Sequence, residues 1–224
     1  DRIKFEFTSM LIHDLRTPLT SIIGFAKVLF NNESDEEKKS FLDVILQNSN
    51  RMMDLINDFL DFSKIGAGKF EINKSPAVIT MIIDNVINSL NILAKNKSIS
   101  IKKEFDENLP FVNIDSRKIE QVVTNLLNNA IKFTNPNGTI IIKGFLENGF
   151  INVSIQDNGI GISEEEQERI FTPYYQSMSG KNSEEKGSGL GLVISKMIIE
   201  AHGGSVSVNS KPGEGSVFTF TLPV

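Results

Sequence analysis

The sequence predicts two structural units of different class: an α-helical hairpin that forms a four-helix bundle in a dimer, followed by an α/β two-layer sandwich. Before position 66, apolar residues recur at alternating intervals of four and three residues, which is typical of a helix packed along a heptad seam. After position 77, helical segments mix with short strand-like segments, two of them joined as a hairpin. This mixture is typical of helices layered on one face of a mixed sheet.

The predicted hairpin contains one apolar seam on each helix. The seams comprise Leu11, Leu15, Pro18, Ile22, Phe25 and Leu29, and then Phe41, Ile45, Asn48, Met52, Leu55, Phe59 and Phe62. Ser34 followed by Glu37 predicts a capping box at the start of the second helix, and Gly66 and Gly68 predict its end. Because one hairpin cannot bury both sides of its seam, we expect a homodimer through residues 1–66. The alternative is a hairpin packed only on its own second half.

The predicted sandwich begins after a linker at residues 67–76 and occupies residues 77–224. Its second helix is expected to be capped by Ser116, and its strand hairpin to turn at Asn148-Gly149. We expect helices at 78–97, 116–134, 164–170 and 191–204, and strands at 98–106, within 139–157, at 205–210 and at 216–224.

The composition narrows the class of protein. A net charge of −5 argues against nonspecific nucleic-acid binding as the main function. The absence of cysteine excludes disulfides, thiolate metal sites and a cysteine nucleophile. No apolar run approaches the ~18 residues of a membrane span, and the chain begins at Asp1 rather than Met. We therefore expect a cytoplasmic module of a longer protein, with any membrane attachment in a missing N-terminal part.

Two glycine motifs lie next to predicted helices. "DNGIGI" (157–162) follows a strand, and "GSGLGL" (187–192) opens a helix. Glycines let the backbone approach a ligand closely, and helix N-termini offer N–H groups to phosphate. Neither motif fits a Rossmann or P-loop pattern, and either one alone is equally compatible with a plain turn.

The helix at 116–134 carries a polar stripe. Asn125, Asn129 and Lys132 are spaced four and three residues apart, so they share one helix face. Amide oxygens beside an ammonium group suit a hydrated Mg²⁺ carried by nucleotide phosphates. The alternative interpretation is a solvated polar face.

The motifs "NLLNNAIKFT", "DNGIGI", "IFTPYYQ", "GSGLGL" and "GEGSVFTFTLP" occur in this order and resemble the N, G1, F and G2 boxes of sensor histidine kinases. "FTSMLIHDLRTPL" (7–19) resembles the H box of the same family, so the likeness covers essentially the whole chain. The resemblance implies the Bergerat ATP-binding fold for residues 77–224, preceded by a dimerising hairpin with a phospho-accepting histidine.

The resemblance also implies roles in ATP binding. Asp157 would accept a hydrogen bond from the adenine amino group, and Gly159 and Gly161 would let the chain close over the base. Asn129 would ligate Mg²⁺, and Asn125 would lie near metal-bound water. The remaining implied residues are Lys132 at a phosphate, Phe133 beside the nucleotide, Phe171 and Tyr175 as anchors of an ATP lid within 163–186, and Gly187, Gly189, Leu190 and Gly191 at the end of that lid.

The heptad phase places His13 on the outer side of the first helix, with Thr17 one turn further on. An unperturbed imidazole is largely neutral near pH 7, so a ring nitrogen is available to a γ-phosphate. Asp14 can hold the proton on the other ring nitrogen. By resemblance, Asp14 assists autophosphorylation and Thr17 positions water for dephosphorylation of a partner. Pro18 is expected to kink the helix, and His202 to cap a helix and interact with its dipole.

The resemblance therefore implies an ATP- and Mg²⁺-dependent histidine autokinase that passes its phosphoryl group to an aspartate of a response-regulator receiver domain, with phosphatase activity toward that regulator as a further expectation. Three positions depart from the family pattern: Ile12, Asp14 and Gln176 stand where serine, glutamate and arginine are common. The alternatives are a degenerate kinase acting as a dimeric receiver-binding module, and another Bergerat-fold ATPase or serine kinase.

Overall fold

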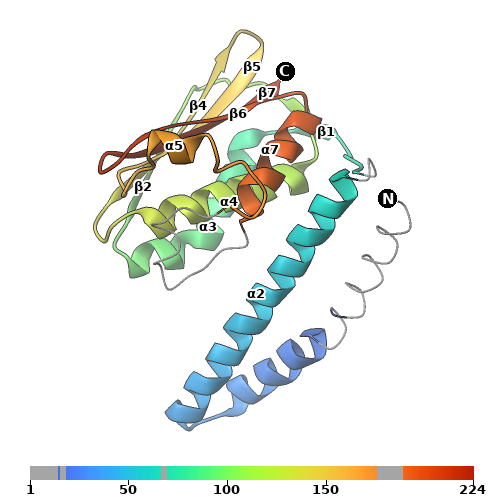
Figure 1. Cartoon of the computed structure of the whole chain (residues 1–224), viewed down its shortest axis with the longest axis vertical. Helices are drawn as coiled ribbons and strands as arrows, with labels where there is room; N and C mark the ends of the chain where they lie inside the picture. The colour runs from blue at the N-terminus through green and yellow to red at the C-terminus, as the bar shows by residue number, and fades with distance from the viewer. Residues whose placement is uncertain (1–14, 16–18, 67–69, 176–188) are drawn as a thin grey trace. The chain divides into compact units, whose positions relative to one another are not determined.

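The computed structural model describes residues 15, 19–66, 70–175 and 189–224. The chain divides into two compact units, Asp1–Phe70 and Glu71–Val224, and each is considered by itself below (Figure 1). Four of the predicted site residues lie outside the described residues, namely His13, Asp14, Thr17 and Gly187. The same holds for Pro18 and Gln176.

The first unit is a helical hairpin. Residues 19–32 are helical, and after a short polar loop α2 (Glu36–Gly66) runs for 31 residues. The predicted end of this helix at Gly66 is confirmed. The chain reverses between the two helices, as Figure 1 shows. Near that reversal the ammonium group of Lys39 lies 5.2 Å from the centroid of the Phe30 ring.

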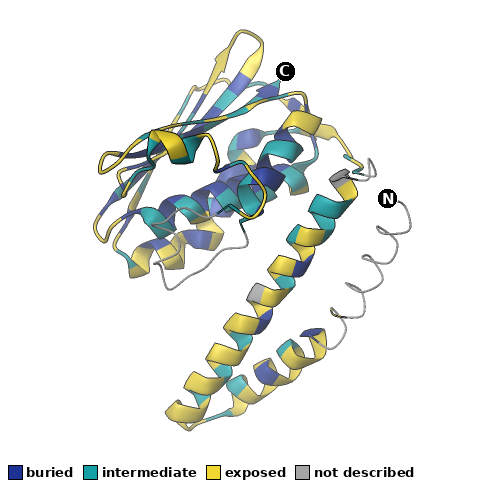
Figure 2. Cartoon of the chain, in the orientation of Figure 1, coloured by how far each residue is buried: buried dark blue, intermediate teal, exposed yellow. Residues whose placement is uncertain are grey.

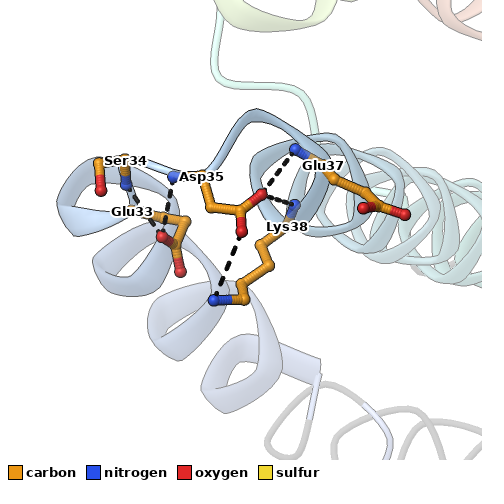
Figure 3. A network of polar contacts seen from close by, with 5 residues as sticks. All are labelled: Glu33, Ser34, Asp35, Glu37 and Lys38. Carbon is orange, nitrogen blue, oxygen red and sulfur yellow. Dashed lines mark hydrogen bonds and ion pairs between the residues drawn. The ribbon is translucent and has the colours of Figure 1, made fainter.

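The predicted capping box at the start of α2 is wrong. Oδ1 of Asp35 accepts hydrogen bonds from the backbone N–H groups of Glu37 at 3.0 Å and Lys38 at 3.3 Å (Figure 3). Oε1 of Glu33 accepts from the N–H groups of Ser34 at 2.9 Å and Asp35 at 3.0 Å. A carboxylate satisfies the same free N–H groups as a serine hydroxyl, and its charge also interacts favourably with the helix dipole. Asp35 therefore replaces Ser34 as the cap.

The hairpin packs along a stripe that lies beside the predicted seams. Leu19 and Ile56 are buried, and Ile23, Met53 and Leu60 pack against them. Most described apolar residues of the predicted seams remain between 37% and 72% exposed in the single chain, and only Phe62 among them is half-buried: the exposed ones are Leu15, Ile22, Phe25, Leu29, Phe41, Ile45, Met52, Leu55 and Phe59. Figure 2 shows the predominance of exposed positions along α2. Each helix thus has two apolar stripes, and the chain itself buries only one.

The second unit contains a five-stranded mixed sheet. Its order is β2 (Ser100–Phe105), β4 (Thr139–Glu147), β5 (Phe150–Asp157), β7 (Gly215–Pro223) and β6 (Val206–Lys211). β2 pairs with β4 in parallel, and the other pairs are antiparallel. The predicted turn is confirmed, because Asn148 and Gly149 have φ values of 51° and 79°, as a type I′ hairpin turn requires.

A second, two-stranded sheet was not predicted. β1 (Ser75–Ala77) pairs antiparallel with β3 (Val112–Ile114). Ser75 and Pro76, which the sequence placed in a linker, therefore belong to a strand. These strands have three residues each, which is too short to produce a clear alternation in the sequence.

Helices α3 (Ile79–Asn96), α4 (Ser116–Phe133) and α7 (Gly191–Ala201) cover one face of the large sheet (Figure 1). The core lies between these layers and includes Ile151, Val153, Ile155, Phe218, Phe220 and Leu222 from alternating positions of β5 and β7. The predicted helix at 164–170 is shorter than expected, because α5 spans only Glu164–Gln167. Within the described ranges, no helix is both long and apolar enough to cross a membrane.

The cap of α4 is Asp115 and not Ser116. Oδ1 of Asp115 accepts a hydrogen bond from the N–H of Lys118 at 3.2 Å, and Oδ2 accepts one from the N–H of Asn73 at 3.1 Å. The N–H of Asp115 in turn donates to Nε2 of His202 at 3.0 Å. Asp115 therefore connects the first residues of this unit to α4 and to the end of α7.

His202 is the C-cap residue of α7, as predicted, and is 2% exposed. Its Nδ1 lies 2.7 Å from the carbonyl oxygen of Ile198. Because the N–H of Asp115 can only donate, Nε2 must accept, so the ring is neutral with its proton on Nδ1. Burial lowers the pKa of His202 below its ordinary value of 6.5. The cap is therefore a neutral imidazole, whose Nδ1–H donates to the carbonyl oxygen of Ile198.

Candidate functional site

The carboxylate of Asp157 lies at the end of β5 and is 6% exposed. Its Oδ1 accepts hydrogen bonds from the backbone N–H groups of Gly159 at 2.8 Å and Ser216 at 3.3 Å. Oδ2 has no hydrogen-bond partner among the described residues. Burial raises the pKa of this carboxyl above its ordinary value of 3.8, and the two backbone hydrogen bonds offset part of the rise. The site therefore holds an acceptor oxygen ready for a donor group.

The loop after Asp157 is held close to the end of α4. The N–H of Ile160 donates to the carbonyl oxygen of Phe133 at 3.2 Å. A methyl group on Gly159 would overlap that same carbonyl oxygen. Gly161 has a φ of 70°, and a methyl group there would overlap the carbonyl of Lys211. Both glycines are thus required by backbone contacts on either side of the loop.

The polar stripe of α4 is partly covered by α7. Nδ2 of Asn125 donates to Oγ of Ser195 at 2.9 Å. The Asn129 side chain, one turn further along α4, is half-buried and has no hydrogen-bond partner within the described ranges. The ammonium group of Lys132 lies 5.2 Å from the centroid of the Phe133 ring. Asn129 and Lys132 therefore lie near the end of α4 that also contacts Gly159.

The start of α7 borders the same region. Leu190 is the N-cap residue and is 3% exposed, and no side chain among the described residues caps this helix end. Gly189 has a φ of 71°, and its carbonyl oxygen accepts from the N–H of Tyr174 at 3.0 Å. The first N–H groups of a helix have no partner within the helix itself, so Gly191 begins a segment suited to bind an anion.

Phe171 and Tyr175 are both half-buried and lie beside cations. The guanidinium carbon of Arg169 lies 4.8 Å from the centroid of the Tyr175 ring. Nζ of Lys196 lies 5.8 Å from the centroid of the Phe171 ring. The sequence predicted that apolar contacts anchor these rings; what the structure shows is a cation–π contact at each ring.

Two residues of this region were not identified from the sequence. Ser216 contacts Asp157 because the two residues are paired in the register of β5 and β7, which no local pattern reveals. Ser195 follows Gly191 by four residues and is 2% exposed. A small residue one turn after a glycine on a helix was the available signal for a close contact between helices.

Comparison with known proteins identifies both units. Residues 3–68 match the His Kinase A (phospho-acceptor) domain, and residues 114–224 match the family of histidine kinase-, DNA gyrase B- and HSP90-like ATPases. Hybrid signal transduction histidine kinase B of Dictyostelium discoideum is 41% identical over 98% of this chain. The signal transduction histidine-protein kinase BarA of Escherichia coli is 36% identical over 99% of this chain. The chain spans only 11% and 25% of the lengths of these two relatives.

Solved structures agree with this assignment. Full-length ShkA in complex with AMPPNP superposes with a TM-score of 0.82 at 29% identity, over 97% of this chain and 45% of that chain. The catalytic domain of the histidine kinase ThkA superposes with a TM-score of 0.60 at 31% identity, over 67% of this chain and 97% of that chain. ThkA in complex with the response regulator TrrA superposes with a TM-score of 0.66 at 28% identity, over 97% of this chain and 61% of that chain. This chain therefore belongs to the sensor histidine kinases of two-component signalling, and it contains their phospho-acceptor hairpin and their ATPase domain.

Proposed function

We propose that this chain is an ATP-dependent kinase that phosphorylates its own His13 and passes the phosphoryl group to an aspartate of a response-regulator receiver domain. The observation that carries the proposal is the buried Asp157 carboxylate. One of its oxygens is held by two backbone N–H groups, and the other has no partner among the described residues. An acceptor oxygen held in a fixed position suits the recognition of a ligand N–H group.

Asp157 is the residue that would select adenine. The exocyclic amino group of adenine would donate to Oδ2. A guanine base places a carbonyl oxygen at that position, so two acceptors would face each other without a proton between them. A buried polar group left without a partner discriminates strongly between ligands. The close contact between Gly159 and the carbonyl of Phe133 supports a loop that fits against the base.

The phosphates would lie between α4 and the start of α7. The N-terminus of α7, which no side chain among the described residues caps, supplies N–H groups, and Lys132 supplies a positive charge. The half-buried Asn129 fits a Mg²⁺ ligand, because its amide has no hydrogen-bond partner within the described ranges and amide oxygens are suitable ligands for this ion. When bound, Mg²⁺ neutralises charge on the transferring phosphates. Asn125 lies on the same helix face.

Phosphoryl transfer would form a bond between a ring nitrogen of His13 and the γ-phosphorus. The bond from that phosphorus to the bridging oxygen breaks, and ADP leaves with the electron pair. Asp14 would hold the proton on the other ring nitrogen and stabilise the imidazolium. Thr17 would position water when the partner regulator is dephosphorylated. These three roles rest on the resemblance of residues 7–19 to the H box.

The hairpin would act as a homodimer through residues 1–66, with residues 77–224 as the catalytic domain. The support is the second apolar stripe, which includes Phe25 at 72% and Phe41 at 61% exposure in the single chain. Fully burying one such side chain stabilises an interface by roughly 1.5–3 kcal/mol. The partner for phosphotransfer would be a receiver domain, since the similar ThkA was solved with a response regulator.

The test is incubation with γ-labelled ATP and Mg²⁺, followed by treatment of the product with acid and with alkali. Label that is acid-labile and alkali-stable is expected, and it should be lost in His13→Ala and in Asn129→Ala. Asn128→Ala is the matched control, because Asn128 is the neighbouring asparagine on α4 and is exposed. Acid-stable label that survives His13→Ala would instead indicate a serine or threonine kinase.

A further inference from the structure

The side chain of Asn125 on α4 lies against two small residues of α7. Its Nδ2 donates to Oγ of Ser195 at 2.9 Å. Its Oδ1 occupies the space that a methyl group on Gly191 would need. Gly191 and Ser195 are one helical turn apart, so they lie on the same face of α7. Figure 1 shows α4 and α7 on the same side of the sheet. The amide of Asn125 contacts both of these α7 residues.

We propose that Ser195 is a positioning residue for the kinase reaction. By accepting the hydrogen bond of Asn125, it fixes the spacing between the polar stripe of α4 and the first turn of α7. The inference rests on the proposed function, in which Asn129 on α4 holds the metal ion and the start of α7 binds the phosphates. In this arrangement α4 binds the metal ion and α7 binds the phosphates of the same nucleotide. The distance between the two helices must therefore be set by a contact between them.

The burial of this contact explains why it fixes a spacing. Ser195 is 2% exposed, so its hydroxyl has no access to water. If the helices slide apart, the Nδ2 of Asn125 loses its partner while it is still partly covered, which costs free energy. Apolar side chains tolerate small shifts because their contacts are not directional. A hydrogen bond between the two helices is directional, so it does not tolerate such shifts.

A second polar link joins the same helices at their other ends, where the N–H of Asp115 donates to His202. That link cannot replace the first. Ser195 and His202 are seven residues apart on α7, or about 10 Å along a helix that rises 1.5 Å per residue. Rotation of α7 about its far end would therefore still move the first turn. Ser195 is the residue that opposes this movement at the nucleotide end.

The simpler explanation is that Ser195 only fills a small buried space. The two explanations differ in which ligands depend on the hydroxyl. A positioning role affects the phosphates and the metal ion, and it leaves the adenine site unchanged because Asp157 is held by β5 and β7. A filling role affects all ligands equally, or none.

The test measures two dissociation constants, that of AMPPNP in the presence of Mg²⁺ and that of adenosine. Each ligand is titrated into the protein, and nuclear magnetic resonance spectra are recorded at every step. Ser195→Ala is expected to weaken AMPPNP about five- to tenfold, as the loss of one buried hydrogen bond implies, and to change adenosine affinity less than about twofold on the same scale. Asn125→Ala removes the same hydrogen bond by truncating its donor on α4. This variant tests the contact between the helices if Ser195→Ala does not fold. Adding Ser195→Ala to Asn125→Ala should cause no further loss.

Ser154→Ala is the matched control. Ser154 is also a buried serine, at 8% exposure, and it lies in β5 away from the helix contact. It should bind both ligands like the wild type. A Ser195→Ala variant that binds both ligands normally, or loses both in parallel, would overturn the positioning role while leaving the kinase assignment intact. A wild-type chain that binds neither ligand would overturn the proposed function and this inference together.

Discussion

The backbone N–H of Ser216 donates to Oδ1 of Asp157 at 3.3 Å, across a strand pair that joins residues 59 positions apart in the sequence. Together with the N–H of Gly159, it holds one carboxylate oxygen in place and leaves the other oriented for a ligand. The residue that we propose to recognise adenine is thus positioned by backbone groups, and one of these groups is placed by the pairing of β5 with β7.

Asp157→Asn should abolish nucleotide selection without unfolding the domain. The amide oxygen can still accept from Gly159 and Ser216, but the new NH₂ group would face the amino group of adenine. We expect ATP affinity to fall on the order of a hundredfold or more. Because burial raises the pKa of the carboxyl, the ionised form destabilises the fold at neutral pH. The melting temperature of the variant should therefore be equal or higher. A variant that keeps wild-type ATP affinity would contradict the assignment of the base site.

The neutral His202 ring should make stability depend on pH. Its native pKa lies below the ordinary value of 6.5 because of burial, with a smaller lowering by Lys74 and opposing effects of Ile198 and Asp115. As the pH falls from 6.5 toward the native pKa, the unfolded chain takes up the proton first. The stabilisation is therefore fully present above pH 6.5 and is lost as the pH falls through that window.

Denaturant titrations at pH 7.5 and 5.5 test this, with His202→Gln as the comparison because glutamine does not titrate. The wild type should lose more stability than the variant between the two values. Equal losses would show that the folded chain protonates this ring as readily as the unfolded chain does, which contradicts a lowered pKa of His202. At pH 7.5, His202→Ala should cost about 2 kcal/mol, because it removes two buried hydrogen bonds.

Gly191→Ala should destabilise the catalytic domain even though alanine is the better helix former by about 1 kcal/mol. The added methyl group would overlap Oδ1 of Asn125. Adding Asn125→Ala should remove the overlap and restore part of the lost melting temperature. Gly24→Ala is the control, since Gly24 is also helical but has open space at the methyl position. If Gly191→Ala melts above the wild type, as Gly24→Ala should, the methyl group does not meet Asn125, which contradicts this prediction.

A charge in the exposed apolar stripe of the hairpin should prevent dimerisation. Ile45 is 44% exposed in the single chain. Ile45→Lys places a lysine on each side of a symmetric interface, so its cost counts twice. With roughly 1.5–3 kcal/mol per buried side chain, the dissociation constant should rise at least about hundredfold. Sedimentation equilibrium measures this dissociation constant.

Gln47→Lys is the control for this prediction, because Gln47 is an exposed position on another face of α2. This variant should leave the dimer intact. Equal dissociation in both variants would point to a general effect of charge and contradict the proposed interface.

Local sequence patterns were sufficient for several elements. The heptad spacing predicted α2, the glycines Gly66 and Gly68 predicted its end, and Asn148-Gly149 predicted the turn between β4 and β5. These features depend on residues within one or two turns of each other. The ordered motifs predicted the family because they lie at characteristic positions along one chain.

The caps were less predictable, because several candidates compete within one loop. Asp35 and Asp115 took the positions expected for Ser34 and Ser116. Each pair is adjacent in the sequence, so a shift of one residue in the helix start exchanges them. A carboxylate then has the advantage of its charge near the positive end of the helix.

The sequence by itself determined the two units, their order and the family, and it predicted the residues that we propose to face a nucleotide. Only the tertiary structure decided which of two apolar stripes is buried within the hairpin, that Ser216 holds Asp157, and that Ser195 holds Asn125. The physical reason is that these contacts join residues far apart in the chain. Their geometry is set by how strands and helices pack, and no pattern of neighbouring residues encodes that packing directly.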